Sequence, residues 1–332
     1  MAQAPIIVTP GDPAGIGAEI ALKAWQQGCN DFVIFEDVTR LQQLASDLGL
    51  NIKIVSILQP EAFDPDCDAM QVLPISWAVA PKPGTPDTAN APMVIKTIKD
   101  AAGYAQNHQA AAMVTNPIAK ATLYAAGFTY PGHTEFLGSL CSPDKGAPLM
   151  MLACDELRVV PLTVHIPLID VASQMTSESI INACRLIAKS LRRYEKINDP
   201  HIAVSGLNPH AGEQGSMGQE DATIIAPAIA ALRAENINVT GPHPADTLFH
   251  AEARARYDAV LGMYHDQVLI PLKTIDFYGG VNITLGLDFI RTSPDHGTGF
   301  DIAGQGLARP DSLIAAIKQA RRMAIRQAAS DE

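Results

Sequence analysis

The chain has 332 residues, which is enough for two domains or for one large α/β domain. Its formal net charge of −11 argues against nonspecific nucleic-acid binding, and it contains no apolar run long enough to span a membrane. The amino terminus has no basic segment before an apolar stretch, and the five cysteines form no CxxC pair, so we expect a cytoplasmic protein with reduced thiols.

Short apolar runs alternate with amphipathic segments in the first third of the chain. We expect strands at Ile6–Thr9, Asp31–Glu36, Ile52–Ile57 and Ala110–Thr115, and helices at Ala18–Gln27 and Pro92–His108. The segment Cys67–Pro92 is rich in proline and aspartate, and we interpret it as a long connection. Strands that alternate with helices are typical of an α/β fold with a mostly parallel sheet.

The middle of the chain has a different pattern. Two β-rich runs within Ala147–Val164 flank an acidic turn at Asp155–Glu156, which predicts an antiparallel hairpin. Helix–strand alternation then resumes, with elements expected at Ser177–Tyr194, His201–Ser205, Gln219–Glu235, Tyr257–Met263 and Ser312–Ala329.

Three histidines share one context, because His165, His210 and His265 each come after an apolar strand-like run. Ligands of open α/β sheets bind at the carboxyl ends of the strands, so three imidazoles could converge there on a divalent metal. The alternative is that each histidine is only hydrogen-bonded at a strand end. Asp246 and Asp266 are nearby carboxylates that could orient a ligand or hold a metal-bound water. The alternative for both is a turn or helix cap.

The segment around His210 is unusual in composition. Between Ser205 and Asp221 it contains Pro209 and the glycines Gly212, Gly215 and Gly218. Proline and this much glycine exclude regular structure and allow unusual backbone angles, so we expect an irregular loop at this position.

A second group of residues could bind an anion. His133 and Thr134 lie at an expected helix start, where backbone N–H groups favour a phosphate, although Thr134 could be a plain N-cap. Lys273 and Arg291 occur in apolar, strand-like surroundings and therefore need an anionic partner or a route to solvent at a rim. Asn282 could donate to a carboxylate or phosphate oxygen.

Two glycine-rich loops stand near the ends of the chain. Thr9–Ile20 contains Gly11, Gly15 and Gly17 between a strand and a helix, but it does not match the GxGxxG pattern. Asp295–Ser312 precedes the last helix. Composition alone favours a nucleotide site and a plain connection equally.

Long motifs of the sequence match one enzyme family in order. They are TPGDPAGIG, VTNPIAK, GHTEFL, LTVHIPL, GLNPHAGE, GPHPADT, MYHDQ and GVNITLGLDFIRTSPDHGTG. On these motifs, which cover nearly the whole chain, the sequence resembles the 4-hydroxythreonine-4-phosphate dehydrogenase family of vitamin B6 biosynthesis. The two glycine-rich loops also resemble those of the wider isocitrate and isopropylmalate dehydrogenase superfamily.

The resemblance implies an oxidation of 4-phosphohydroxy-L-threonine at its secondary alcohol, with NAD or NADP as the cofactor. The product, 2-amino-3-oxo-4-(phosphonooxy)butanoate, then loses CO₂ to give 3-amino-2-oxopropyl phosphate. One divalent metal ion, zinc, magnesium or cobalt, is also implied for each active site, where it would lower the pKa of the alcohol.

The resemblance also implies roles for individual residues. The metal ligands would be His165, His210 and His265, and the substrate contacts would be His133, Thr134, Lys273, Asn282 and Arg291. The cofactor contacts would be Gly11, Asp12, Gly15, His296, Gly297, Thr298 and Asp301. The catalytic candidates from the residues themselves are Lys273, Asp246 and Asp266, and a water held by the metal is an alternative proton acceptor.

The implied architecture is isopropylmalate dehydrogenase-like, with two α/β/α domains, a mixed sheet and a cleft that holds the active site. We expect residues 1–130 and 275–332 to form a cofactor-side domain, and residues 131–274 to form a second domain with the dimerisation and metal-ligand residues. A homodimer with active sites shared between subunits is expected.

Other functions fit parts of the pattern. Paralogues of the family act on 4-phosphorylated threonate or on cyclic dihydrodiols. A metal hydrolase or acyl transferase could also use three histidines and an anion pocket, but it would not need a dinucleotide at Asp295–Ser312. A ligand-binding protein without catalytic activity would not need the metal ligands.

Overall fold

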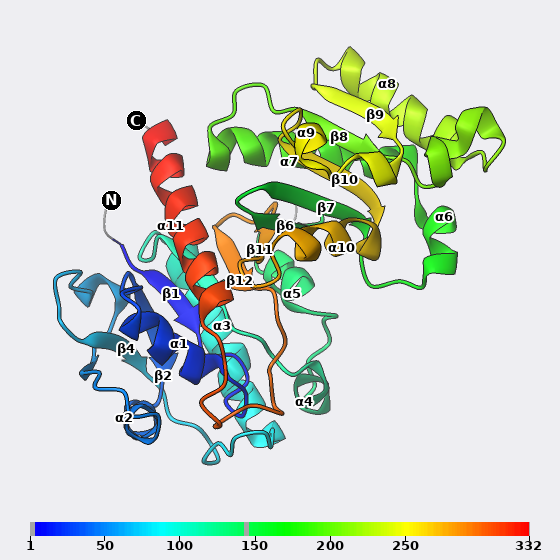
Figure 1. Cartoon of the computed structure of the whole chain (residues 1–332). Coiled ribbons are helices and arrows are strands. Elements are labelled where there is room, and N and C mark those ends of the chain that lie inside the picture. The colour runs from blue at the N-terminus through cyan, green and yellow to red at the C-terminus, as the bar shows by residue number, and fades with distance from the viewer. Residues whose placement is uncertain (1–3, 143–145, 332) are drawn as a thin grey trace. The chain divides into compact units, whose positions relative to one another are not determined.

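In a computed structural model, which describes residues 4–142 and 146–331, the chain divides into two compact units (Figure 1). The first unit comprises Met1–Pro148 and Leu287–Glu332, and the second comprises Leu149–Gly286. The chain thus crosses between the units near residues 148 and 286, where the sequence analysis placed the crossings near 130 and 275.

Two elements account for the difference in these boundaries. Helix α5 (His133–Ser139) buries Phe136 and Leu137 in a core cluster of the first unit, together with Ile98. Strand β11 (Val281–Leu285) pairs with a strand of the second unit. Burial and strand pairing along the whole of each element therefore decide the unit to which it belongs.

The first unit contains a parallel sheet with strand order β3-β4-β2-β1-β5-β12. Its strands are β1 (Ile6–Thr9), β2 (Phe32–Glu36), β3 (Ile54–Ser56), β4 (Met70–Pro74), β5 (Ala112–Thr115) and β12 (Arg291–Pro294). Each neighbouring pair is parallel, with Ile6 opposite both Phe32 and Ala112. The carboxyl ends of these strands consequently share one edge of the sheet.

Helices cover the sheet of the first unit. They are α1 (Gly17–Gln26), α2 (Val38–Asp47), α3 (Ala91–Gln106), α4 (Lys120–Ala125), α5 and α11 (Asp311–Asp331), with short 3₁₀ turns at Pro60–Ala62 and Thr88–Asn90. Helix α11 packs on β12 and β5 and lies beside α1, whereas α3 packs on β1 and β5. One core cluster joins α3 to the sheet through Ile98, Ile7 and Met113, which are all fully buried.

The interpretation of Cys67–Pro92 as a connection was wrong, because it contains strand β4 between β2 and β3. The strand was missed because the polar Gln71 interrupts its apolar run. This side chain is 2% exposed, and its amide exchanges hydrogen bonds with the backbone N–H and C=O of Asp64 at 2.9 and 2.6 Å. A satisfied polar group can thus replace an apolar one in a buried strand.

The second unit contains a mixed sheet with strand order β11-β6-β7-β10-β8-β9. Besides β11, its strands are β6 (Leu149–Cys154), β7 (Leu157–Thr163), β8 (Ile202–Ser205), β9 (Val239–His243) and β10 (Ala259–Tyr264). The pairs β11–β6 and β6–β7 are antiparallel, and the pairs β7–β10, β10–β8 and β8–β9 are parallel. The predicted hairpin and the predicted α/β class with a mixed sheet are therefore confirmed.

The helices of the second unit begin with α6 (Val171–Gln174) and α7 (Ser177–Glu195), followed by α8 (Ala226–Ala234), α9 (Ala251–Arg254) and α10 (His265–Ile275). Short 3₁₀ elements lie at Leu168–Asp170, Pro209–Gly215 and Ala245–Thr247. Helix α7 starts at a capping box between Thr176 and Ser179.

Two predictions in the second unit need correction. The single helix expected over Gln219–Glu235 begins as a π-helical turn, Asp221–Ile225, and becomes α-helical at Ala226. Pro227 explains the change, since it has no N–H to donate to the preceding turn. The apolar run before Lys273 is not strand-like but lies in α10, where the internal Pro271 disguised a helix.

All five cysteines are free thiols, as predicted. Burial raises the pKa of the Cys29 thiol to about 11 and that of Cys184 to about 12. Within the described ranges, no helix is both long and apolar enough to cross a membrane.

Candidate functional site

The three histidines follow three adjacent strands of the second unit. His165 comes two residues after β7, His265 directly after β10, and His210 within the segment after β8. Strand β10 pairs in parallel with both β7 and β8, so all three histidines leave the same edge of the sheet. The rings of His165 and His265 lie side by side, with centroids 6.0 Å apart.

A cavity of about 310 Å³ opens beside this histidine pair. It is lined by Thr163, Val164, His165, Ile166, Leu168, Val171, Tyr264, His265 and Asp266. The Thr163 hydroxyl donates to the carbonyl oxygen of Met263 at 2.7 Å and so joins the ends of β7 and β10. The cavity has room for a small ligand that contacts both rings.

Asp266 orients His265. The Nδ1 atom of the imidazole lies 2.7 Å from Oδ1 of the carboxylate, and the two side chains are 34% and 72% exposed. A carboxylate on Nδ1 leaves Nε2 as the ring atom available to a ligand. Asp246 is exposed in the 3₁₀ turn after β9, at the same edge of the sheet.

The segment that carries His210 has the unusual backbone that its composition predicts. His210, Ala211, Glu213 and Gln214 all adopt positive φ, at 53°, 52°, 40° and 57°, on either side of Gly212. Left-handed backbone costs a residue with a Cβ roughly 1–2 kcal/mol. Such a run persists only where the surrounding structure holds it in place.

Asp221 supplies much of that support, and the sequence analysis did not identify it. The carboxylate is 2% exposed and accepts hydrogen bonds from the backbone N–H of Leu207 at 2.9 Å and of Asn208 at 3.2 Å. It also accepts from Nδ2 of Asn208 at 3.0 Å. A Cβ on Gly206 would lie 2.6 Å from Oδ1 of Asp221, so glycine is required for this approach.

Gln267 ties the ends of β8 and β10 together. Its amide nitrogen donates to the carbonyl oxygen of Gly206 at 2.7 Å, and its amide oxygen accepts from the N–H of Met263 at 2.6 Å. The residue stands two positions after His265. It therefore fixes the strand end that leads to His210 against the strand end that carries His265.

The structure does not bring His210 into a three-ligand group with the other two histidines. Among the described residues, no group of three or more His, Cys, Asp or Glu side chains has the geometry to hold a metal ion. The pair His165 and His265 is formed, and His210 shares its edge of the sheet.

In the first unit, Arg291 is buried and His133 is half-buried, and the charge of Arg291 acts on the imidazole. Arg291 begins β12, is 3% exposed, and donates to the hydroxyl of Thr115 from Nη2 at 2.6 Å. Burial lowers the pKa of its guanidinium to about 10, against the attraction of Glu135. Burial, and then the charges of Arg291 and Lys120, hold the pKa of His133 well below its usual value, so this imidazole is neutral.

His133 has a free hydrogen-bonding atom. Its Nε2 is buried and has no partner among residues 4–142 and 146–331. A buried polar atom of this kind favours a ligand. Helix α5 begins at His133, as predicted, but its N-cap is Gly132, so the interpretation of Thr134 as an N-cap was wrong. Lys120 was missed, although it ends the quoted motif VTNPIAK.

Lys273 and Asn282 are both half-buried in the second unit. Lys273 lies in α10, eight residues and thus about 12 Å along the axis from His265. Its ammonium is 5.4 Å from the ring centroid of Phe277. Asn282 lies opposite Leu152 in the β11–β6 ladder, and its Oδ1 is buried without a partner in the described part of the chain.

The two glycine-rich loops, far apart in sequence, touch at the carboxyl edge of the first unit. The N–H of Ile16 donates to the carbonyl oxygen of Thr298 at 3.0 Å. A Cβ on Gly15 would lie 2.7 Å from the same oxygen, so only glycine permits this contact. Glu19 and Lys23 of α1 strengthen the junction, since both bond to the backbone of Ala308.

Other polar atoms gather where these loops begin. The hydroxyl of Thr9, both side-chain polar atoms of Asn116 and Nε2 of His296 are buried without partners within the described ranges. Asn116 is fully buried directly after β5, next to Gly11, and was missed although VTNPIAK contains it.

The remaining predicted cofactor residues differ in exposure. Asp12 is 5% exposed, accepts from the N–H of Ala14 at 2.9 Å, and has its pKa raised by burial, so it shapes the loop. Gly297 and Asp301 are exposed.

Comparisons with known proteins agree on one family. A family model described as pyridoxal phosphate biosynthetic protein PdxA matches residues 27–320. A 4-hydroxythreonine-4-phosphate dehydrogenase of Caulobacter vibrioides is 50% identical, over 98% of this chain and 99% of that protein.

Solved structures with a similar fold include a member of the same family and a dehydrogenase of another name. The crystal structure of 4-hydroxythreonine-4-phosphate dehydrogenase from Klebsiella pneumoniae is similar with a TM-score of 0.89 and 37% identity, over 97% of this chain and 99% of that one. A terephthalate 1,2-cis-dihydrodiol dehydrogenase from Burkholderia xenovorans is similar with a TM-score of 0.64 and 26% identity, over 96% and 98%.

Proposed function

Because the chain belongs to the PdxA family of pyridoxal phosphate biosynthetic proteins, we propose that it oxidises 4-phosphohydroxy-L-threonine with NAD or NADP. The product is 2-amino-3-oxo-4-(phosphonooxy)butanoate, which decarboxylates to 3-amino-2-oxopropyl phosphate. The observation that carries the proposal is 50% identity to a 4-hydroxythreonine-4-phosphate dehydrogenase over nearly the full length of both chains.

Arg291 and His133 bind the anionic substrate in this proposal. A guanidinium that is 3% exposed gains most from a bound phosphate or carboxylate, because that anion replaces the water it has lost. The neutral His133 can donate from Nε2 to an oxygen without adding to the positive charge beside Arg291. Thr134, Lys273 and Asn282 complete the proposed substrate contacts.

The glycine-rich loops hold the nicotinamide cofactor. The residues present fit such a group, because Nε2 of His296 is a buried atom without a partner in the part of the chain described. Gly11 and Gly15 allow their loop to pack closely on the backbone of Pro117 and Thr298. The other proposed contacts are Asp12, Gly297, Thr298 and Asp301. A nicotinamide cofactor bound there would accept the hydride, and these residues would set the position of its ring.

We call the sheet edge that carries His165, His210 and His265 the histidine edge. Its imidazole and carboxylate groups are of the types that bind a divalent metal. Three imidazoles leave adjacent strand ends, and the carboxylate of Asp266 fixes the tautomer of His265. Zinc, magnesium or cobalt bound there would act as a Lewis acid toward the reacting oxygen. Lys273, Asp246 and Asp266 are the proposed proton acceptors for the substrate hydroxyl.

The proposal includes a cytoplasmic homodimer with shared active sites. Leu168 and Ile169, which are 67% and 88% exposed, form an apolar surface next to His165 that a second copy would cover. The five free thiols support a reducing compartment.

Absorbance of the reduced nicotinamide tests the proposal. The purified protein would be incubated with NAD⁺ or NADP⁺, a divalent metal and 4-phosphohydroxy-L-threonine, with a parallel arm in EDTA. We expect reduction that needs both the metal and the substrate. No reduction with this substrate under any metal would contradict the proposal.

A second candidate function follows from the terephthalate dihydrodiol dehydrogenase, which has 26% identity and a similar fold. The same assay with a cis-dihydrodiol and with 4-phospho-D-threonate separates these substrates. The buried Arg291 favours an anionic substrate, so we expect a dihydrodiol that carries no carboxylate to be the poorest of the three.

A further inference from the structure

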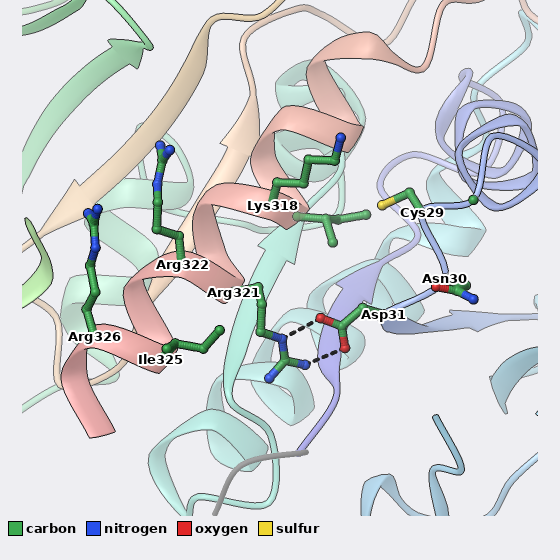
Figure 2. A pocket seen from close by; sticks show the side chains of 10 residues that line it. Cys29, Asn30, Asp31, Lys318, Arg321, Arg322, Ile325 and Arg326 are labelled. Carbon is green, nitrogen blue, oxygen red and sulfur yellow. Dashed lines mark hydrogen bonds and ion pairs between the residues drawn. The ribbon is translucent and has the colours of Figure 1, made fainter. Parts of the chain in front are cut away.

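The first unit carries cations at both edges of its sheet, and the two groups differ in their partners. Figure 2 shows the group at the amino edge, around a pocket of about 410 Å³ beside Asp31, the residue before β2. Arg321 points toward Asp31 and donates to it from Nη2 at 2.6 Å, and Arg322 donates to the side-chain oxygen of Gln319. These two guanidinium groups are therefore bound by protein groups.

At the carboxyl edge, Lys120 has no such partner. It begins α4, five residues after the end of β5, and it is exposed. Within residues 4–142 and 146–331 its ammonium makes no hydrogen bond and no ion pair. Thr115, the last residue of β5, accepts the hydrogen bond from the buried Arg291. Lys120 is therefore available to a ligand at the edge of the sheet that Arg291 reaches.

The ammonium of Lys120 lies beside Gly132, the residue before His133. A Cβ on Gly132 would be 3.7 Å from Nζ of Lys120. The positive charge of Lys120 also helps to lower the pKa of His133, after burial and the charge of Arg291. Nε2 of His133 is buried and has no partner in the described ranges. An ammonium, an imidazole and a guanidinium thus act on one small region.

One carboxylate lies in the same region. Oε2 of Glu135 would be 3.4 Å from the same Cβ on Gly132, and the charge of Glu135 opposes the fall in the pKa of Arg291. Glu135 is exposed, and in the described part of the chain no ion pair or hydrogen bond joins it to Lys120. Because solvent screens an exposed carboxylate, Glu135 offsets part of the positive charge and leaves the ammonium of Lys120 unoccupied.

We propose that Lys120 is a further binding residue, which donates to the phosphate group of a phosphate monoester together with Arg291 and His133. Such a phosphate has three terminal oxygens and nearly two negative charges at neutral pH. Three donor groups, two of them cationic, match both features. A carboxylate has two oxygens and one charge, so it would leave one donor unused. This inference rests on the proposed function, which supplies the phosphorylated substrate, and adds a contact to it.

Inorganic phosphate tests the site without catalysis. In protein labelled with ¹⁵N in its histidine rings, we expect phosphate at about pH 7.5 to shift the NMR signals of His133 at millimolar concentration. Lys120→Met should weaken this binding at least about tenfold, and Lys120→Arg should restore most of it. Lys99→Met removes another exposed lysine, from α3, and should bind as the wild type does. An affinity in Lys120→Met equal to that of the wild type would overturn the assignment.

Glu135→Gln separates a local charge effect from a loss of structure. Removing the carboxylate takes away its repulsion of the phosphate, so binding should tighten about threefold, opposite in direction to Lys120→Met. A disturbed fold would weaken binding in both variants. Weaker phosphate binding in Glu135→Gln would therefore contradict the proposed arrangement of charges.

Steady-state kinetics connects the site to the substrate. In Lys120→Met, KM for 4-phosphohydroxy-L-threonine should rise at least about tenfold, while KM for the nicotinamide cofactor stays near the wild-type value. An unchanged KM for the substrate would remove Lys120 from the substrate site. If the wild type oxidised no substrate but its phosphate binding still depended on Lys120, the proposed function would fail and the phosphate site would stand.

Discussion

Key polar side chains of the candidate substrate and loop sites in the first unit are buried, whereas the histidine–carboxylate pair of the second unit is more exposed. Arg291 and Asn116 are 3% and 0% exposed, while the Asp266 side chain is 72% exposed. Burial makes a charge costly, and in the proposed function the anionic substrate offsets part of that cost at Arg291. The second unit must position its groups by other means.

Those means are backbone strain and hydrogen bonds. Around His210 the chain holds non-glycine residues in the left-handed region, and Asp221 and Gln267 bond to the backbone beside them. In the first unit, glycines bring the loops together, as Gly15 does against Thr298. The contrast predicts that substitutions in the first unit change substrate and cofactor binding, whereas those in the second change the order of a loop.

The largest effect is expected for Arg291→Met. It removes charge-assisted hydrogen bonds to the substrate, each worth about 1.5–3 kcal/mol, so kcat/KM should fall roughly 100-fold or more. Steady-state kinetics with varied substrate measures the change. Arg185→Met is the control, because Arg185 is an exposed partner of Glu235. A near-normal kcat/KM in Arg291→Met would contradict the proposal that this buried guanidinium binds the anionic substrate.

Asp221→Asn should lower activity about 10- to 100-fold, the range typical of residues that orient metal ligands. Leu207 and Asn208 donate to different oxygens of the carboxylate, and asparagine replaces one of these with an NH2 group that cannot accept, so residues 206–219 should also exchange their amide hydrogens faster. Asp258→Asn is the control, since Asp258 accepts from the N–H of His201 before the same strand. Unchanged exchange in this segment would remove Asp221 from its proposed role.

Gly15→Ala should raise KM for the nicotinamide cofactor about tenfold with a smaller change in kcat. The added Cβ would meet the carbonyl oxygen of Thr298 at 2.7 Å and separate the loops. Gly103→Ala in α3 has open space around it and should leave KM unchanged. Equal KM values in both variants would show that this loop contact does not shape the cofactor site.

The smallest effect concerns pH. The folded state keeps His133 neutral with a pKa well below 6.5, mainly because of burial, whereas the unfolded chain protonates it near that value. Stability from this residue is therefore present above about pH 6.5 and is lost as the pH falls.

His133→Gln should make the Tm less sensitive to pH between about 7 and 5. His108→Gln, at an exposed position, should keep the wild-type slope. An identical slope in His133→Gln and wild type would show that the buried imidazole does not resist protonation.

The periodic elements were predictable from the sequence because local patterns determine them. Strand β1 has the predicted bounds, and the turn at Asp155–Glu156 joins β6 to β7 as predicted. Strand β4 was not predictable, since the buried Gln71 depends on a partner seven residues away. Helix α10 was also missed, because a proline inside a segment normally argues against a helix. Here α10 packs on β7, and this packing offsets the hydrogen bond that Pro271 cannot make.

The candidate site was predictable only in part. His165 and His265 could be identified because each follows an apolar run that predicts a strand. The two rings lie close together because the two strands are adjacent and parallel. Asp221 has no such signature, since a carboxylate that binds backbone 14 residues away resembles any helix-start acid. Asn116 was likewise hidden, because an unpartnered buried amide is visible only in three dimensions.

The most direct test of the account is cobalt binding to the histidine edge, followed by visible absorption. We expect one Co²⁺ per chain in the wild type. His165→Ala, His210→Ala and His265→Ala should each weaken binding at least about 100-fold. His250→Ala, an exposed histidine of the same unit, should bind as the wild type does. Wild-type affinity and spectrum in His210→Ala would contradict the claim that the three strand ends form one metal site.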